Sequence, residues 1–503
     1  MGDAGHSPPP LTGQAGLPSL NPTKSFWQTS HPNPLAKHRS TSSVPSSADI
    51  VVIGTGISGT FATHDILTTA TDQALNVVVL EARTTCSAAT GRNGGHCQPL
   101  VHAERSAVID FEMRNYAHIR DLVKRYDVPC DFRQLPGVLG FWNKTYFEEA
   151  KAALQGALVT AEHRQLVKVV EGAKELEELR LTGGVVGAIV QRVAASLSPY
   201  KLMVWLWGQM IKEYERSESE GGGERPNKVS SLNLQTETPV TGIKEAQGGG
   251  DGWTVRTSRG DVHAKHVILA TNGYTSHLIP EFADLISPVQ AQMSALLPPQ
   301  GSPFRERLIP MSYGMMGVEG QDRVMSDYLV QNPILEEDAG GVVGRGGHLM
   351  FGGGRAQAKG NGVGVSDDDY VDGDAETYLR SLPERLDLEA DAGVRTSSSK
   401  GGLLDIAASW TGIIGSSADG HPWVGGVPGR DGLFVVAGYS GHGMTNAGLC
   451  GRHVAQLALA SLKGEDWRAL QDQGVELAEQ GKGGVPREYV ITQERMNAAQ
   501  GVR

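Results

Sequence analysis

The chain has 503 residues, of which 39% are hydrophobic and 20% charged, a composition typical of a globular protein with two to three domains. Its formal net charge of −11 disfavours nucleic acids and anionic membrane surfaces as partners. No apolar run approaches the ~20 residues of a membrane-spanning helix, and four widely spaced cysteines without a C-x-x-C pair argue against a zinc site or a disulfide scaffold.

The first 47 residues are rich in Pro, Ser, Thr and Asn and have few large apolar side chains. This composition predicts a disordered leader, and it lacks the apolar segment of a secretory signal. We therefore predict a cytoplasmic protein. Lys24, Lys37 and Arg39, with few acids nearby, leave a mitochondrial transit peptide as the alternative.

A nucleotide-binding pattern follows the leader. The apolar run 50–53 predicts a buried parallel strand, and Gly54, Gly56 and Gly59 then complete G-x-G-x-x-G before a helix. In such a unit the glycines allow a tight turn, close approach of a pyrophosphate, and close packing of the helix on the strand. A second apolar strand ends at Glu81, whose carboxylate is placed to accept hydrogen bonds from a ribose. The alternative is a glycine-rich turn before an ordinary helix.

Residues 88–96, Ala-Ala-Thr-Gly-Arg-Asn-Gly-Gly-His, form a segment of small residues that also carries hydrogen-bond donors. Two alanines and three glycines indicate backbone that lies close to a flat or bulky group, although a flexible surface loop is the alternative. A helix is predicted over 103–126, and the region 147–181 is interpreted as helices.

The later part of the chain predicts a second domain and then a return to cofactor binding. Residues 240–264 predict a β-meander that leads into an apolar strand ending at Ala-Thr-Asn-Gly273, and 286–395 predict a mixed or antiparallel sheet. The apolar strand 433–437, the glycine turn 438–444 and a helix from about 447 to 462 form a second strand–turn–helix unit. Its positive helix end would face a second electron-rich group.

These elements predict an α/β protein with a Rossmann-like dinucleotide-binding domain and an interleaved second domain built on a mixed or antiparallel sheet (α+β). The predicted boundaries are 1–47 for the leader, 48–135, 215–285 and 396–465 for the dinucleotide-binding domain, 136–214 and 286–395 for the substrate domain, and 466–503 for a C-terminal tail.

Together these motifs resemble the FAD-dependent oxidoreductases of the D-amino-acid oxidase and sarcosine oxidase family, and in particular its γ-glutamylputrescine-oxidase-like branch. The resemblance spans about residues 48–465. It is carried by the Gly54–Gly59 fingerprint with Glu81, Thr90–Gly95, Lys124–Asp131, Ala270–Gly273, Phe351–Gly354, Trp410–Gly412 and Gly438–Gly443.

The resemblance implies that FAD extends between the first helix and the C-terminal helix, with the glycine turn beside the flavin pyrimidine edge. It implies these cofactor contacts: Gly54, Gly56, Ile57, Ser58, Gly59, Glu81, Ala82, Arg83, Arg92, Asn93, Gly94, Gly95, His96, Val240, Thr271, Gly438, Gly441, His442, Gly443 and Met444. His442 and Arg92 are also candidate catalytic residues, and no metal ligands are predicted.

The chain departs from the family near Gly412, where sarcosine oxidases carry the cysteine that attaches FAD. We therefore predict non-covalent FAD, with His96 as the alternative attachment site. The leading hypothesis is an oxidoreductase, more an oxidase than a dehydrogenase, that oxidises the C–N bond of a small amine or amino acid. It would transfer a hydride to flavin N5, with O2 as acceptor. An NAD(P)-dependent dehydrogenase and a non-catalytic flavin-binding protein are the alternatives.

Overall fold

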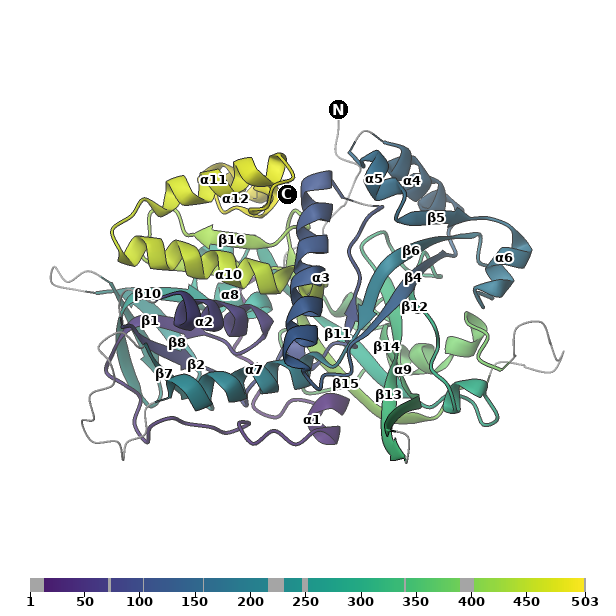
Figure 1. The fold of residues 1–503 in the computed structure, drawn as a ribbon, viewed down its shortest axis with the longest axis horizontal. Helices are drawn as coiled ribbons and strands as arrows, with labels where there is room; N and C mark the ends of the chain where they lie inside the picture. Colours follow the sequence, from purple (N-terminus) through teal and green to yellow (C-terminus); the bar gives the residue numbers. More distant parts are fainter. Residues whose placement is uncertain are drawn as a thin grey trace.

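The computed structural model describes residues 13–70, 74–102, 104–156, 158–215, 230–246, 252–338, 341–389 and 402–501. They form two β-sheets, each covered by helices, which lie side by side on either side of the long helix α3 (Ser106–Tyr126) (Figure 1). The eight-stranded sheet, which we call sheet A, has the strand order β16-β17-β10-β1-β2-β7, with β9 also paired to β10 and β8 paired to β9. The nine-stranded sheet, which begins at β15, is sheet B.

Sheet A carries the predicted nucleotide-binding pattern. Its parallel centre pairs Val51 of β1 with Val267 of β10 on one side and with Val78 of β2 on the other. Because both faces of these strands are buried, the apolar runs are continuous rather than alternating. Its strands are β1 (Ser47–Ile53), β2 (Asn76–Leu80), β7 (Ser231–Gln235), β8 (Val240–Glu245), β9 (Trp253–Thr257), β10 (Gly260–Leu269), β16 (Trp423–Gly426) and β17 (Leu433–Ala437).

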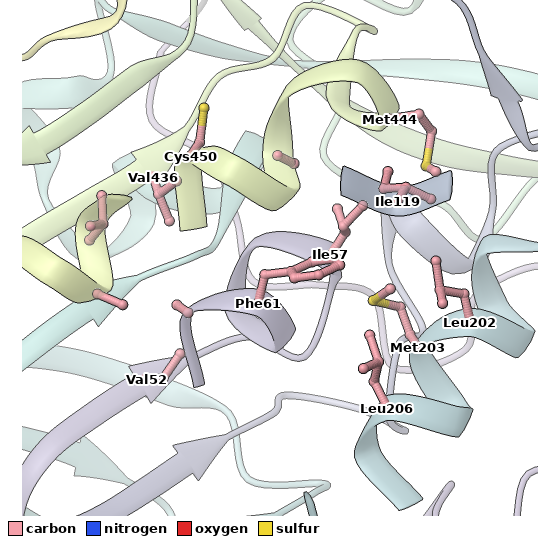
Figure 2. Packing of buried hydrophobic residues seen from close by; sticks show 14 of the residues in the cluster. Val52, Ile57, Phe61, Ile119, Leu202, Met203, Leu206, Val436, Met444 and Cys450 are labelled. Carbon is pink, nitrogen blue, oxygen red and sulfur yellow. The ribbon is translucent and has the colours of Figure 1, made fainter. Parts of the chain in front are cut away.

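One face of sheet A is covered by α2 (Ile57–Thr69) and α10 (Gly443–Leu462), and α7 (Pro199–Tyr214) packs beside α2. Figure 2 shows the core between these helices, where Phe61 of α2 lies among side chains of α7 and α3, with α10 above them. This apolar contact holds the N-terminal ends of α2 and α10 in fixed positions.

Sheet B has the strand order β15-β11-β14-β13-β12-β4-β6-β3, with β5 beside β6, and most of its neighbouring strands are antiparallel. This confirms the predicted mixed sheet and the α/β fold class. Its strands are β3 (His96–Cys97), β4 (Arg133–Phe141), β5 (Val167–Val170), β6 (Gly187–Ser196), β11 (Ile286–Leu296), β12 (Ser312–Met316), β13 (Ser326–Asp338), β14 (Gly341–Gly353) and β15 (Ile406–Ser417).

The structure corrects the local prediction for residues 147–181, which are not all helical. The region contains α4 (Lys144–Gln155), α5 (Ala161–Arg164) and α6 (Ala173–Glu178), but β5 lies between the last two and pairs with β6. The short run Val-Lys-Val-Val favours a strand because β-branched side chains pack well on a pleated surface. Segment 396–465 also serves both sheets, since β15 belongs to sheet B. The two-domain boundaries themselves stay a prediction.

The expected disordered leader is wrong for residues 13–47, while residues 1–12 lie outside the described part of the chain. Helix α1 (Phe26–Ser30) lies where the two sheets meet, in contact with α7 and β15 (Figure 1). Trp27 is only 2% exposed, and the backbone of the segment pairs with the chain that it crosses, for example Ser40 N–H with Leu234 O at 2.9 Å. From composition alone, the entropy lost on ordering this segment is expected to exceed what its contacts contribute. One large buried ring and these long-range hydrogen bonds offset that entropy cost.

The C-terminal tail is also ordered over its described residues, up to 501. Helices α11 (Trp467–Glu479) and α12 (Gln493–Gln500) follow α10, and the hydroxyl of buried Tyr489 donates to Asn446 Oδ1 at 2.8 Å. The short helices α8 (Thr275–Leu278) and α9 (Gly373–Arg380) complete the set. No helix in the described ranges is long and apolar enough to cross a membrane.

Candidate functional site

The N-terminus of helix α2 has no cap from its own N-cap residue. Gly54 has φ +109°, and a Cβ there would lie 2.7 Å from the carbonyl oxygen of Ala270, so the turn requires glycine. The N-cap Gly56 makes no side-chain cap, and the hydroxyl of Thr90 accepts from Ile57 N–H at 3.0 Å. The first turn therefore keeps the positive end that binds anionic groups such as a pyrophosphate.

Two further glycines let the helices approach closely. A Cβ on Gly59 would lie 2.0 Å from the carbonyl oxygen of Gly54, and one on Gly451 of α10 would lie 2.3 Å from the carbonyl oxygen of Ser58. The hydroxyls of Ser58 and Tyr439 are hydrogen-bonded at 2.7 Å. These contacts fix the N-terminal turn of α2 and the turn before α10 relative to each other.

Glu81 lies at the end of β2, as predicted, with its carboxylate buried beside the glycine turn. Its Oε2 accepts from Thr55 N–H at 3.1 Å and from the Thr55 hydroxyl at 2.6 Å, and its Oε1 accepts from Arg83 N–H at 3.0 Å. These bonds fix the orientation of the carboxylate beside the glycine turn. The guanidinium of Arg83 is directed elsewhere, to the buried carboxylate of Asp368 at 2.8 and 3.0 Å.

The second glycine turn has the same character as the first. Gly438 (φ +79°) and Gly441 (φ +92°) adopt left-handed conformations, and Asn272 Oδ1 accepts from Gly438 N–H at 3.1 Å. A Cβ on Gly441 would meet no atom within 4 Å. The N-cap residue of α10, His442, makes no side-chain cap, and its own N–H donates to Tyr439 O at 2.8 Å. The open turn again leaves a positive helix end available to an electron-rich group.

A buried carboxylate supports this turn from behind. Glu112 of α3 accepts from Asn446 Nδ2 at 2.7 Å, from the Thr445 hydroxyl at 3.1 Å and from Leu100 N–H at 2.7 Å. Asn446 Nδ2 also donates to His442 O at 3.0 Å. Burial raises the pKa of Glu112 to about 7, against the opposing effect of these hydrogen bonds. The first turn of α10 therefore rests on a group that titrates near neutral pH.

Residues 88–96, which we call the glycine loop, are braced by Arg92. Its side chain is 1% exposed and donates to Ser87 O and Thr411 O at 2.7 Å each and to Thr23 O at 2.7 Å, with Asp368 Oδ2 at 3.3 Å. Burial lowers the pKa of Arg92 to about 10, so the group is still cationic at neutral pH. This geometry disfavours the predicted catalytic or flavin-binding use of the guanidinium, because its donors are engaged by the protein.

The other end of the glycine loop meets sheet B. Gly94 N–H donates to the Tyr328 hydroxyl at 2.7 Å, and this hydroxyl lies 3.2 Å from Met293 Sδ. A Cβ on Gly94 would lie 2.8 Å from the Tyr328 ring. His96 stacks on the same ring, with centroids 5.8 Å apart, and bonds the Ser312 hydroxyl at 2.9 Å. Burial lowers the pKa of His96 to about 4 and raises that of Tyr328 to about 12, so both groups are neutral at physiological pH.

The structure brings most of the predicted cofactor residues together through these contacts. Thr271 lies near the end of β1, because the N–H of its neighbour Ala270 donates to Ile53 O at 3.0 Å. Val240 lies near Glu81, because the N–H of Thr238, two residues before it, donates to Glu81 O at 2.8 Å. Ala82 follows Glu81, Asn93 and Gly95 lie in the glycine loop, and Gly443 and Met444 open α10. Two helix ends whose N-cap residues make no side-chain cap, together with the glycine loop of small residues, fit an extended dinucleotide.

Sequence reasoning missed several residues that hold this site. Only Glu112 had a local signal, since it lies four residues after Val108 and seven before Ile119, at helical spacing on the buried face of its helix. The others act through partners far away in the chain: Thr23, Trp27, Thr55, Thr90, Asn272, Tyr328 and Asp368.

Comparison with known proteins agrees with this geometry. The family model described as FAD dependent oxidoreductase matches residues 49–457. Gamma-glutamylputrescine oxidoreductase of Escherichia coli (strain K12) is 25% identical over 444 residues, 81% of this chain and 83% of that protein. Probable oxidoreductase OrdL of Rhizobium meliloti (strain 1021) is 24% identical over 431 residues, 82% and 83% of the two chains. The crystal structure of glycine oxidase from Geobacillus kaustophilus shares the fold, with a TM-score of 0.58 at 16% identity over 84% of this chain and 96% of that one.

Proposed function

The chain belongs to the family of FAD dependent oxidoreductases, and from this premise we propose that it oxidises the C–N bond of a small amine or amino acid. FAD is its cofactor. The similarity to a gamma-glutamylputrescine oxidoreductase and the fold shared with a glycine oxidase support an amine or amino acid as the substrate class. When bound, FAD supplies the hydride acceptor for the C–H bond next to the substrate nitrogen.

Different segments of the site would bind different parts of FAD. The first turn of α2, at Gly56 to Gly59, would hold the pyrophosphate, and Glu81 would accept from the ribose. The glycine loop and the open turn at Gly438–His442 would flank the flavin, where the helix end of α10 stabilises negative charge. His442 stays a candidate for contact with the flavin or the substrate.

The substrate would bind where the glycine loop meets sheet B, beside Tyr328, Met293 and His96. The pKa values of Tyr328 and His96 are shifted so that both side chains are uncharged, and Met293 is apolar. An amine that loses a hydride must be unprotonated, since its lone pair stabilises the developing cation. Desolvation among neutral groups favours that form of the amine.

Two further features of the proposal concern the cofactor link and the electron acceptor. The four cysteines are free and buried, and Gly412 occupies the family position of the attaching cysteine, which supports non-covalent FAD. The imine formed from the amine would be hydrolysed by water to a carbonyl compound and ammonia or a smaller amine. O2 is the proposed acceptor, which would take up two electrons and two protons to give hydrogen peroxide.

The observation that carries the proposal is the neutral surface formed by His96 and Tyr328 against the glycine loop. It is tested by stopped-flow reduction of the holoprotein with primary, secondary and amino-acid amines at several pH values, followed by re-oxidation in air. The rate of flavin bleaching is expected to rise with pH, and peroxide is expected to form in equal amount to flavin. A rate that is independent of pH where the amine titrates would contradict the proposed desolvation of a neutral amine.

A further inference from the structure

A segment near the N-terminus, residues 21–31, crosses the glycine loop from outside the two sheets. We call it the strap. It includes α1, which begins with a capping box between Ser25 and Gln28. The strap contacts both halves of the molecule, because the Phe26 ring lies tilted against the ring of His348 of β14, with centroids 4.6 Å apart, and α1 also lies against α7 (Figure 1).

Thr23 is the point at which the strap joins three separate segments. Its hydroxyl accepts from Arg92 Nη1 at 3.1 Å and from Thr411 N–H at 3.0 Å, and donates to Asp368 O at 2.9 Å. Its carbonyl accepts from Arg92 Nη2 at 2.7 Å, and its N–H donates to Asp368 O at 2.7 Å. The side chain that braces the glycine loop is therefore held in turn by one strap residue.

The strap also sets the direction of peptide groups within the glycine loop. The Ser25 hydroxyl donates to Gly91 O at 2.7 Å, and Trp27 Nε1 donates to Asn93 O at 2.6 Å. In the peptide between Asn93 and Gly94, the carbonyl is thus bound by the strap while the N–H is bound by Tyr328 of sheet B. Because a trans peptide is planar, these two bonds on opposite edges fix the rotation of the whole group.

We propose that the strap is a positioning element for the cofactor: residues 23–27 fix the glycine loop in the conformation that retains FAD. This inference rests on the proposed placement of the glycine loop beside the flavin. Since coupling between two binding equilibria is reciprocal, FAD must in turn order the strap.

The test compares Thr23→Val with Thr23→Ser. Valine has the shape of threonine but no oxygen, so it leaves Thr411 N–H and one Arg92 N–H without their acceptor, whereas serine keeps all three bonds of the hydroxyl. FAD release is measured by the recovery of flavin fluorescence after dilution, and the visible circular dichroism of bound flavin reports its surroundings. Thr23→Val is expected to release FAD about tenfold faster with an altered flavin spectrum, and Thr23→Ser within about threefold of the unchanged protein.

Release at the rate of the unchanged protein from both variants, with unchanged spectra, would overturn the inference. Equal impairment of both variants would also overturn it, because serine keeps the three hydroxyl bonds to which the inference assigns the effect. If Thr23→Val does not fold, hydrogen exchange of the unchanged protein with and without FAD decides the question. FAD is expected to slow exchange of strap amides such as those of Gln28 and Thr29, as well as those of residues 91–95. If FAD protects the amides of the glycine loop but not those of the strap, the positioning role of the strap is refuted. If FAD does not protect the loop amides, the proposed placement of the flavin beside the loop is refuted.

Discussion

Replacing Gly59 with alanine tests whether the close contact between α2 and the turn before it is required. The added Cβ would lie 2.0 Å from the carbonyl oxygen of Gly54, whereas real Cβ atoms stay beyond 3.0 Å, so α2 must move away by about 1 Å. The obstacle is backbone rather than a flexible side chain. We expect a loss of about 1–3 kcal/mol in the free energy of unfolding, typical of an overpacked core.

The same movement would carry the first turn of α2 away from the pyrophosphate, so FAD occupancy should fall with stability. Urea unfolding and the ratio of flavin to protein absorbance measure the two effects. Gly208→Ala is the matched control, because Gly208 lies in α7, has an ordinary helical conformation, and has no atom within 4 Å of its Cβ position. It should stabilise the protein by about 0.5–1 kcal/mol. A Gly59→Ala variant that keeps both its urea midpoint and its FAD would refute this packing argument.

Three other variants or treatments test separate parts of the site. Glu81→Gln should weaken FAD binding about tenfold in titrations of the apoprotein, because an amide cannot accept from both Thr55 and Arg83 and also from a ribose; unchanged affinity would place the ribose elsewhere. The folded-state pKa of Glu112, about 7, lies above its usual 4.5, so the stability contributed by its protonated form is complete below about pH 4.5 and is lost as the pH rises through about 7. The free energy of unfolding of the unchanged protein, measured by urea titration, should therefore fall relative to that of Glu112→Gln by up to about 3 kcal/mol between pH 5 and 8, and a constant difference would count against this. Acid precipitation should leave the flavin in solution, as Gly412 indicates, and a yellow pellet would show a covalent link.

Features set by local sequence were predicted well. The strand 50–53, the three glycines and Glu81 lie as expected, because the strand, the turn, the helix end and the carboxylate beside them are all determined within about 30 residues of chain. The second unit, from β17 to α10, follows the same rule. The run Val167–Val170 was missed because four residues next to helices carry too short a period to separate strand from helix.

Features that depend on contacts between distant segments could not be predicted. Trp27 lies in a stretch whose composition indicates disorder, and its burial depends on a binding surface that other elements build. The capping pair Ser25 and Gln28 was a local signal for α1, but a five-residue helix is not stable alone. The role of Arg92 as a brace follows from carbonyls at residues 23, 87 and 411, which no sequence spacing relates.

Anaerobic titration of the purified holoprotein tests the central claim, that bound FAD oxidises amines, most directly. Small amines and amino acids, and separately NADH and NADPH, are added while the flavin absorbance is followed. We expect at least one amine to bleach the flavin at one equivalent per FAD and to yield the matching carbonyl compound, while neither nicotinamide does so. Ready reduction by NADH or NADPH together with no reduction by any amine would contradict it.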